Sequence, residues 1–436
     1  MNRRIFLFIS FVLIFFVHKA VAQQVLTVEE AVELALKNNY QIRMAANDLK
    51  VDETAVSPGR AGMLPKITGT LGDQNRVQNL TQVRSDGSKV SQDNAKNNNL
   101  NYGAGLDWTI FDGFKMFARY DQLKELEKLG QASLKQAILT TVSDVMITYY
   151  DLVQQQQQLS ALDTTLMISN QRVEFAHNRF IIGKASKLDV LNAKVDLNTD
   201  QTLMQRQLER YANTKIKLNQ SLARDTKIDF KVIDEILVDE KLFLPELEKL
   251  VQEQNPQLRA QLINKRIAEL ELKQTVANRY PSIVAGTGYN FGHTKSDLGF
   301  STSSDSHGWN YGIDVSLNIF DGFNQNRNEK IGKIQIENAE LAIAEQTQEL
   351  LSQLGTAYQT YTTNISLIDL EGKNEAIAKE NLEITVDKYR IGIITTVEFR
   401  TAQLNYINAK VRYYNAVYQA KLSEITLKEL AGDLTL

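Results

Sequence analysis

The chain has 436 residues, with 49 lysines and arginines against 52 aspartates and glutamates, a formal net charge of -3 and no cysteine. The absence of cysteine excludes a disulfide framework, a cysteine nucleophile, a cysteine-ligated zinc site and an acylated N-terminal cysteine. Without an excess of basic residues, nucleic acid is not an expected partner. The four histidines share no metal-ligand spacing, so we expect neither a metal site nor a cofactor.

The N-terminal segment has the pattern of a secretory signal peptide. Arg3 and Arg4 precede an apolar run from Ile5 to Val17, and small residues follow at Ala20–Ala22. The alternative, a single membrane-spanning helix, is disfavoured because the run is shorter than the about 20 residues that a span needs. We therefore predict a signal peptide over residues 1–22.

The next stretch has the pattern of an amphipathic helix. Thr27 is a candidate N-cap with Glu29 and Glu30 in the first turn, and apolar residues then recur at helical spacing. Pro58 and Gly59 should end or kink this helix near Ser57. One helix is therefore expected from residue 26 to about residue 57.

Two pairs of short motifs show that the chain is duplicated. The letters IFDGF occur at Ile110–Phe114 and again at Ile319–Phe323, and RFIIG at Arg179–Gly183 matches KYRIG at Lys388–Gly392. A repeated order of motifs means that each half is one structural unit. We predict a first repeat at residues 23–224, a second repeat at residues 245–436, and a linking segment at residues 225–244 that can add short strands.

Each repeat contains an alternating segment before its IFDGF motif. Apolar side chains occupy every second position from Tyr102 to Ile110 and from Tyr311 to Ile319, with small or polar residues between them. A period of two predicts a strand. The expected hairpins cover residues 66–111 and 282–320, with exposed polar loops at residues 73–99 and 293–308.

The alternation of apolar and small polar residues is typical of a membrane β-barrel strand, with an ordinary soluble hairpin as the alternative. Four strands cannot close a membrane barrel, whose minimum is about eight, and an open sheet edge is not tolerated in lipid. If the strands lie in a membrane they must be shared between chains, so that two chains supply eight strands and three supply twelve.

The rest of each repeat predicts a helical hairpin. The runs 115–180 and 324–389 have no proline and little glycine, which predicts helices on the order of 100 Å long with coiled-coil spacing. Gly183 and Gly392 should end them, and return helices are expected at residues 188–222 and 397–430. The glutamine run Gln154–Gln158 is interpreted as a solvated helix face.

Together, these features resemble the TolC family of outer-membrane efflux proteins over essentially the whole mature chain. The resemblance rests on the signal peptide, the duplicated strand hairpin and the tip motifs FIIG at Phe180–Gly183 and YRIG at Tyr389–Gly392. It implies a mainly α fold with a membrane β-barrel part: a trimer with a twelve-stranded barrel in the outer membrane, continuous with a helical coiled-coil tunnel across the periplasm. It also implies a periplasmic adaptor and an inner-membrane transporter as partners.

The resemblance further implies a gate of acidic residues just after the tip glycines. Asp189 and Glu398 occupy the matching positions, whereas Thr401 and the neighbouring Arg400 stand where a second acidic residue could be, which puts a second ring in doubt. Converging carboxylates would repel one another and favour cations. The alternative is that both are first-turn acids that complement a helix dipole.

The tips are also the expected adaptor-docking sites. Phe180, Tyr389 and Arg390 are residue types that often anchor interfaces, and Gly183 and Gly392 form the turns beside them. An aromatic residue at a helix end can instead pack against the returning helix.

The chain shows no catalytic motif, so we do not expect an enzyme. The favoured function is an outer-membrane exit duct of an efflux or type I secretion system. The alternatives are a periplasmic structural or interaction protein and a passive porin-like channel, although a porin has no use for helices of this length. The cargo, whether drug, metal ion or polypeptide, does not follow from the sequence.

Overall fold

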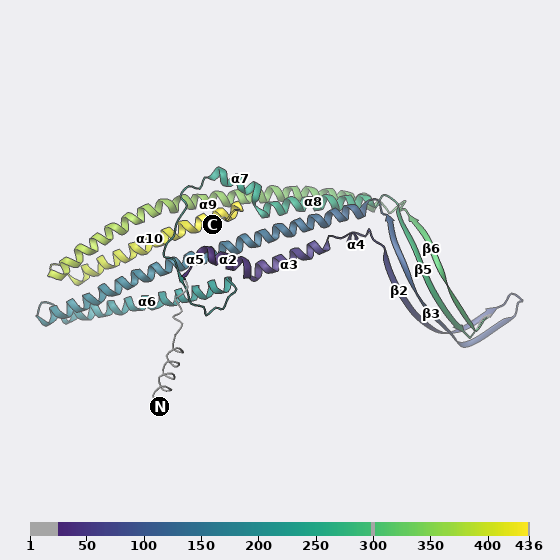
Figure 1. The fold of residues 1–436 in the computed structure, drawn as a ribbon, viewed down its shortest axis with the longest axis horizontal. Helices are drawn as coiled ribbons and strands as arrows, with labels where there is room; N and C mark the ends of the chain where they lie inside the picture. The colour runs from purple at the N-terminus through teal and green to yellow at the C-terminus, as the bar shows by residue number, and fades with distance from the viewer. Residues whose placement is uncertain (1–24, 298–300, 435–436) are drawn as a thin grey trace, which may run out of the picture. The chain divides into compact units, whose positions relative to one another are not determined.

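A computed structural model describes residues 25–297 and 301–434, so the predicted signal peptide lies outside the described residues. The chain forms two compact units (Figure 1). The helical unit consists of Leu134–Pro256, Thr347–Leu436 and the described part of Met1–Ala45; the sheet unit consists of Ala46–Ser133 and Gln257–Gln346. In the part of the chain that the structure describes, no helix is both apolar enough and long enough to cross a membrane.

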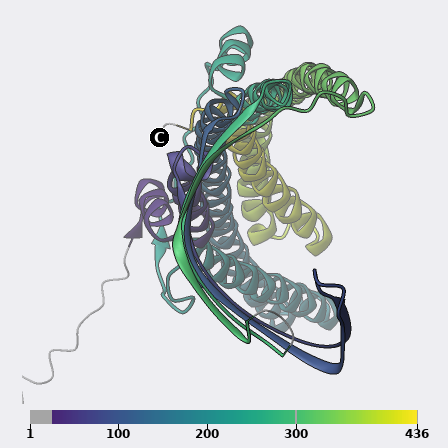
Figure 2. The same cartoon turned by 90° about the vertical axis from the view of Figure 1, so that its right-hand side faces the viewer.

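The sheet unit contains one four-stranded antiparallel sheet, seen as a single curved layer in Figure 2. Its strands, in the spatial order β2-β3-β5-β6, are β2 (Lys66–Val83), β3 (Lys89–Phe111), β5 (Ser282–Ser296) and β6 (Ser303–Ser316). Each repeat contributes one hairpin, as the alternation predicted, and β3 joins β5 to link the two hairpins.

The prediction of long polar loops was wrong. β2 and β3 continue to a turn at residues 84–88, and β5 and β6 continue well into the expected second loop, while β6 ends at Ser316 and not at residue 319. Polar side chains do not prevent strand formation, because the backbone ladder supplies the pairing. At a bulge, the Asn79 side chain accepts a hydrogen bond from the backbone N–H of Asn94 at 2.8 Å.

The β2–β3 hairpin extends beyond the β5–β6 hairpin. The pairing of β3 with β5 ends at Asn97 and Ser296, whereas β2 and β3 remain paired as far as Val83 and Lys89. Residues 78–95 therefore form a ribbon that pairs only with itself among the described residues.

The two faces of the sheet differ in chemistry. Cross-strand partners in an antiparallel sheet point to the same side. Ile67 pairs with Leu106, Leu106 with Thr287, and Thr287 with Tyr311, so these four lie on one face. The large exposed apolar side chains of the four-stranded region share that face, here called the apolar face: Ile67, Leu71, Tyr102, Trp108, Phe291, Trp309, Tyr311, Ile313 and Val315.

The opposite, polar face is built from small and amide side chains. Gly103 lies beside Asn290, and a Cβ added to Gly103 would come within 2.3 Å of the Asn290 side-chain oxygen and 2.5 Å of the Tyr289 carbonyl oxygen. Asn290 in turn donates a hydrogen bond to the Asn310 side-chain oxygen at 2.8 Å. Glycine is thus required where an asparagine of the next strand lies over the backbone.

The duplicated IFDGF motif forms the turn from strand to long helix. Asp112 accepts a hydrogen bond from the backbone N–H of Met116 at 3.1 Å, and Asp321 accepts one from Gln325 at 2.7 Å. Gly113 has a φ of +71°, and an added Cβ there would lie 2.4 Å from a backbone carbonyl oxygen. The same turn is built in both repeats. It requires an aspartate that caps the long helix and a glycine that adopts the left-handed region, which explains why the motif occurs twice.

Four long helices follow the predicted pattern. α5 (Lys115–Ile181) turns into α6 (Lys187–Ser221), and α9 (Asn324–Ile391) turns into α10 (Thr396–Ala431). These bounds confirm the predicted helical hairpins to within about two residues. α5 and α9 begin in the sheet unit and end in the helical unit.

The predicted first helix is divided in both repeats. α2 (Val28–Asn38) and α3 (Tyr40–Ala55) are separated at Asn39, and α7 (Leu244–Gln254) and α8 (Pro256–Ala277) are separated at Asn255; a short helix, α4 (Pro58–Ala61), precedes β2. The backbone of Asn39 is not helical, with a ψ of 132°, and its side-chain oxygen caps the next helix by accepting from the Gln41 N–H at 2.8 Å. A single helix over this range was therefore the wrong prediction.

The same two asparagines attach the divided helices to the return helices. The Asn39 side-chain amide donates to the Ser221 carbonyl oxygen at 2.8 Å, and the Asn255 amide donates to the Leu430 carbonyl oxygen at 2.9 Å. Equivalent contacts in both repeats show that the duplication extends to local geometry.

The core of the helical unit forms around α5. Val145, Tyr149 and Leu152 are buried there, and the Tyr149 hydroxyl donates to the Leu26 carbonyl oxygen at 2.9 Å. Leu26 belongs to β1 (Val25–Leu26), which pairs in parallel with β4 (Lys231–Val232). The linking segment thus contributes the short strand that its sequence allowed.

The interpretation of Gln154–Gln158 as a solvated face was wrong. Gln154 and Gln155 are buried, and their amides donate to the side chains of Asn415 on α10 at 3.2 Å and Thr214 on α6 at 3.0 Å. Gln156 accepts a hydrogen bond from the Tyr211 hydroxyl at 3.1 Å. The run is a polar layer that joins α5 to both return helices, because buried amides need partners.

Candidate functional site: the helical tips

Each helical hairpin turns at its glycine in the same way. Gly183 has a φ of +75° and Gly392 a φ of +85°, a region that residues with a side chain rarely adopt. The Gly183 N–H donates to the Phe180 carbonyl oxygen at 3.0 Å, and the Gly392 N–H donates to the Tyr389 carbonyl oxygen at 3.1 Å. The predicted helix ends are therefore left-handed glycine caps.

Asp189 and Glu398 occupy equivalent places in the first turns of the return helices. The N-cap residues are Ser186 for α6 and Thr395 for α10, and each carboxylate accepts hydrogen bonds from the backbone N–H and the hydroxyl of its own N-cap residue. Both sites are capping boxes. Within one protomer each carboxylate is bound to its own cap, and no hydrogen bond joins these two described residues.

The cap lowers the pKa of Glu398. Backbone and hydroxyl hydrogen bonds from Thr395, at 2.8 and 2.9 Å, hold the pKa of Glu398 below its ordinary value. A group with a lowered folded-state pKa stabilises the fold above its unfolded-state pKa, and this contribution is lost as the pH falls through the folded-state value. Glu398 is therefore ionised at neutral pH within one protomer.

Replacing Thr395 with alanine is expected to raise the pKa of Glu398 toward its ordinary value, because the hydroxyl donor is removed while the backbone donor remains. A titration of the Glu398 carboxyl carbon by NMR would measure the change. Thr395→Ser keeps the hydroxyl and should leave the titration as in the wild type. The same titration curve in Thr395→Ala would show that the hydroxyl does not affect the carboxylate.

The predicted docking residues divide into exposed and buried ones. Phe180 is 41% exposed, and Arg390 is exposed beside Asp387 at 3.6 Å. Tyr389 is only 1% exposed and packs on the Phe399 ring of α10, with centroids 4.8 Å apart. Tyr389 thus packs against its returning helix, which was the alternative reading of an aromatic residue at this place.

Tyr389 also joins the two tips. The Arg179 guanidinium of the first hairpin lies 5.6 Å from the centroid of the Tyr389 ring in the second. A Cβ added to Gly392 would lie 3.6 Å from an Arg179 terminal nitrogen. The tips therefore contact each other through a cation–π pair at the open turn.

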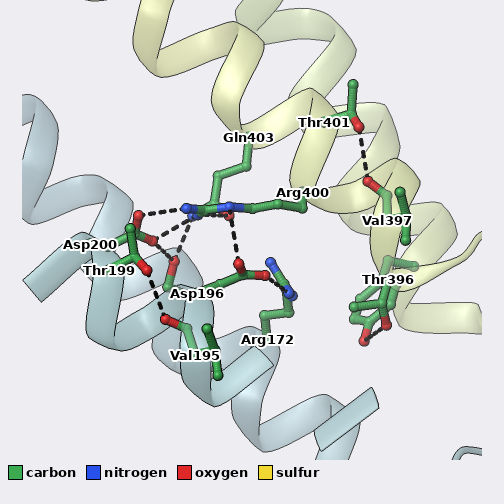
Figure 3. A network of polar contacts seen from close by, with 12 residues as sticks. Arg172, Val195, Asp196, Thr199, Asp200, Thr396, Val397, Arg400, Thr401 and Gln403 are labelled. Carbon is green, nitrogen blue, oxygen red and sulfur yellow. Dashed lines mark hydrogen bonds and ion pairs between the residues drawn. The ribbon is translucent and has the colours of Figure 1, made fainter. Parts of the chain in front are cut away.

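A charged network lies between the hairpins, just beyond the caps (Figure 3). Arg400 of α10 donates to both carboxylate oxygens of Asp200 of α6, at 2.8 Å each. Asp200 is 2% exposed and also accepts from the Ser169 hydroxyl of α5 at 2.6 Å. Gln403 donates to Ser169 at 2.7 Å. Helices of both hairpins thus meet at one buried carboxylate.

A second arginine completes the network. Arg172 of α5 is 1% exposed and pairs with Asp196, which lies 3.9 Å from the Nε of Arg400. The network therefore contains two guanidinium groups and two carboxylates and is neutral. The Nε and Nη1 atoms of Arg172 are buried without a hydrogen-bond partner among the described residues. Removal of the Asp196 carboxylate would leave the buried charge of Arg172 without a partner, which is strongly destabilising.

Sequence reasoning did not find this network. Asp196 and Asp200 lie one helical turn apart on α6, which is a weak signal because such pairs are common on solvated faces. In the sequence, Arg400 stands out only as a basic residue beside Thr401. The hydroxyl of Thr401 donates to the Val397 carbonyl oxygen at 3.0 Å, so this position supplies no second carboxylate.

No three histidine, aspartate or glutamate side chains converge to hold a metal ion in the ranges that the structure describes.

The family model described as "Outer membrane efflux protein" matches residues 31–224 and 247–433.

Similarity to known proteins covers nearly the whole chain. The outer membrane protein TolC of Vibrio cholerae serotype O1 is 22% identical over 414 residues, covering 92% of this chain and 89% of the relative. The proteases secretion protein PrtF of Dickeya chrysanthemi is 20% identical over 425 residues, covering 93% and 88%. The CmeC outer membrane channel of Campylobacter jejuni has a similar fold, with a TM-score of 0.75 at 18% identity, covering 93% and 85%.

Proposed function

Because this chain belongs to the outer membrane efflux protein family, we propose that three copies close a twelve-stranded barrel in the outer membrane, continuous with a helical coiled-coil tunnel in the periplasm. The chain is an outer-membrane exit duct for efflux or secretion and not an enzyme, and it extends into the periplasm.

The sheet is the observation that carries the assembly. Its apolar face is exposed over four strands, and β2 and β6 have no further strand beside them among the described residues. An apolar face of this kind fits lipid, whereas the free edges do not, because lipid cannot satisfy backbone N–H and C=O groups. Two copies would supply eight strands and three would supply twelve; the family favours three.

Asp189 and Glu398 are proposed as the gate at the periplasmic entrance. In a ring of three copies, each position would supply three carboxylates at one level. Their negative charges would repel one another and would favour the passage of cations. The capping boxes support this role, because they fix the direction of each carboxylate at the start of its helix.

The tips are proposed to bind a periplasmic adaptor that connects the duct to an inner-membrane transporter. Ile181 is exposed next to Phe180 at the first tip, and Ile393 is exposed just beyond Arg390 at the second, so each tip offers an apolar surface beside a polar turn. Tyr389 would act by holding the second tip in place, and Gly183 and Gly392 by allowing the turns. Both small molecules and polypeptides fit this proposal as cargo.

Single-channel conductance in a planar bilayer tests the proposed duct, comparing wild type with the double variant Asp189→Ala and Glu398→Ala. We expect a small, cation-preferring current in the wild type and a larger, less selective current in the variant, because the carboxylates narrow and charge the entrance. A large current in both proteins would favour a porin-like channel. Failure of the purified wild type to insert would favour a periplasmic scaffold.

A further inference from the structure

Two of the four long helices lie at the edges of the helical unit. Near the tips, Figure 1 shows the order α9, α10, α5, α6. α10 lies inside this layer, since Arg400 binds Asp200 of α6 and Gln403 donates to the Thr165 carbonyl oxygen of α5 at 3.2 Å. Among the described residues no hydrogen bond or ion pair joins α6 to α9. Each of these two helices therefore has a side without a neighbour.

The free side of α9 carries a heptad pattern. Leu370, Ile377, Ile384 and Ile391 recur at every seventh position, and all four are exposed. The positions between them, three residues before each, are also exposed or half-buried: Leu367, Asn374, Asn381 and Lys388. Alternating steps of three and four residues are the seam of a coiled coil, and this seam has no partner helix in one protomer.

The free side of α6 carries a matching pattern. Leu188, Leu191 and Val195 are exposed at spacings of three and four residues. The same spacing continues through Asn198 and Thr202, which are exposed as well. The seam of α6 is thus apolar near the tip and becomes polar at Asn198.

The polar positions of the two seams lie at similar distances from the tip ends of their helices. α9 runs toward its tip and ends at Ile391, whereas α6 runs away from its tip and starts at Lys187. Asn381 lies ten residues from the end of α9 (391 − 381) and Asn198 eleven from the start of α6 (198 − 187). At 1.5 Å per residue these are distances of about 15 and 16.5 Å along the two helices.

We propose that α6 of one copy packs antiparallel on α9 of the next copy, and that an Asn198–Asn381 amide pair fixes their register. This inference rests on the proposed ring of three copies. In the same register Leu188 faces Ile391 and Val195 faces Ile384. A shift by one heptad would move Asn198 opposite Asn374 and leave the Asn381 amide against Leu191, so that Asn381 would lose its partner; this disfavours the shifted register.

The surroundings of Asn381 fit a polar helix. A groove of about 420 Å³ lies between α9 and α10, and its lining includes Asn374, Asn381, Asn405 and Asn408. Neither Asn198 nor Asn381 makes a side-chain hydrogen bond within the described part of the chain. A second copy of α6 in this groove would cover these amides and bring Asn198 and Thr202 to them as hydrogen-bonding partners.

Cysteine cross-linking tests the register directly, since the chain has no cysteine of its own. The double variant Asn198→Cys with Asn381→Cys, oxidised in outer-membrane vesicles, should form disulfide-linked dimers and trimers on a non-reducing gel. The matched control, Asn198→Cys with Asn374→Cys, moves one partner by seven residues, about 10 Å along the helix, and should link with severalfold lower yield. Each single variant should remain monomeric on the gel.

Native mass measurement of the same vesicle extracts separates the two proposals. A trimer without cross-linking of the Asn198/Asn381 pair, or with equal cross-linking of the offset pair, would overturn the register and leave the proposed duct standing. Ready labelling of Asn381→Cys by a bulky maleimide in the trimer would also overturn the proposed register, because it would show that position 381 is exposed and not covered by α6 of the next copy. A wild-type protein that remains monomeric would overturn both.

Discussion

Arg400→Ala is expected to separate the two helical hairpins near their tips, at a local cost of about 3–5 kcal/mol, because it leaves the Asp200 carboxylate buried without its guanidinium partner. The loss should extend to the Arg172–Asp196 pair, which shares the network. Hydrogen exchange of backbone amides in α6 and α10 near the tips would measure the opening. In the proposed duct, the same change should increase conductance.

The chain offers a matched control on the same helix. Arg412 of α10 pairs with Glu371 at 3.0 Å, but its side chain is about half exposed, so Arg412→Ala should cost no more than about 1 kcal/mol. Adding Asp200→Asn to Arg400→Ala removes the unpaired charge and should restore much of the protection. Equal exchange in Arg400→Ala and Arg412→Ala would show that the buried network does not hold the hairpins together.

Ile313→Lys should strongly reduce assembly in the outer membrane. Ile313 lies on the apolar face of β6, and a lysine facing lipid near the middle of the bilayer costs about 2–4 kcal/mol. A ring of three copies would contain three such lysines, so each assembly would lose this free energy three times. The measurement is the fraction of the protein recovered from outer membranes as a heat-resistant trimer.

The neighbouring residue provides the control. Gly312 points to the polar face, and a Cβ added there meets no atom within 4 Å, so Gly312→Lys should assemble normally. The two variants carry the same new charge one residue apart. If both assembled equally well, the apolar face would not contact lipid.

Elements with a strong period were predictable from the sequence. The alternation from Tyr102 to Ile110 identified a strand and its apolar face, and the long runs ending at Gly183 and Gly392 gave the helix ends to within about two residues. Both patterns depend only on neighbours in the chain, which is why a single sequence was sufficient.

The failures had tertiary causes. The polar residues of 73–99 were expected to form a loop because single-sequence patterns do not show a partner strand, yet the backbone ladder between β2 and β3 pairs them. Gln154 and Gln155 were expected in solvent, but Asn415 and Thr214 arrive from distant helices to bind their amides. Likewise, the contact of Arg400 with Asp200 joins residues of different repeats, which no local pattern reveals.

In the proposed ring of three copies, the unequal length of the two strand hairpins would determine which part of the protein projects farthest from the outer membrane. The turn at residues 84–88 lies at the end of the sheet opposite the IFDGF turns, and the ribbon below it extends past the β5–β6 hairpin. In a closed ring of three copies the outer rim would therefore alternate tall and short hairpins. Antibodies and other large molecules in the surroundings would reach the three tall turns before any other part of the protein, so these turns are the natural positions for an inserted epitope.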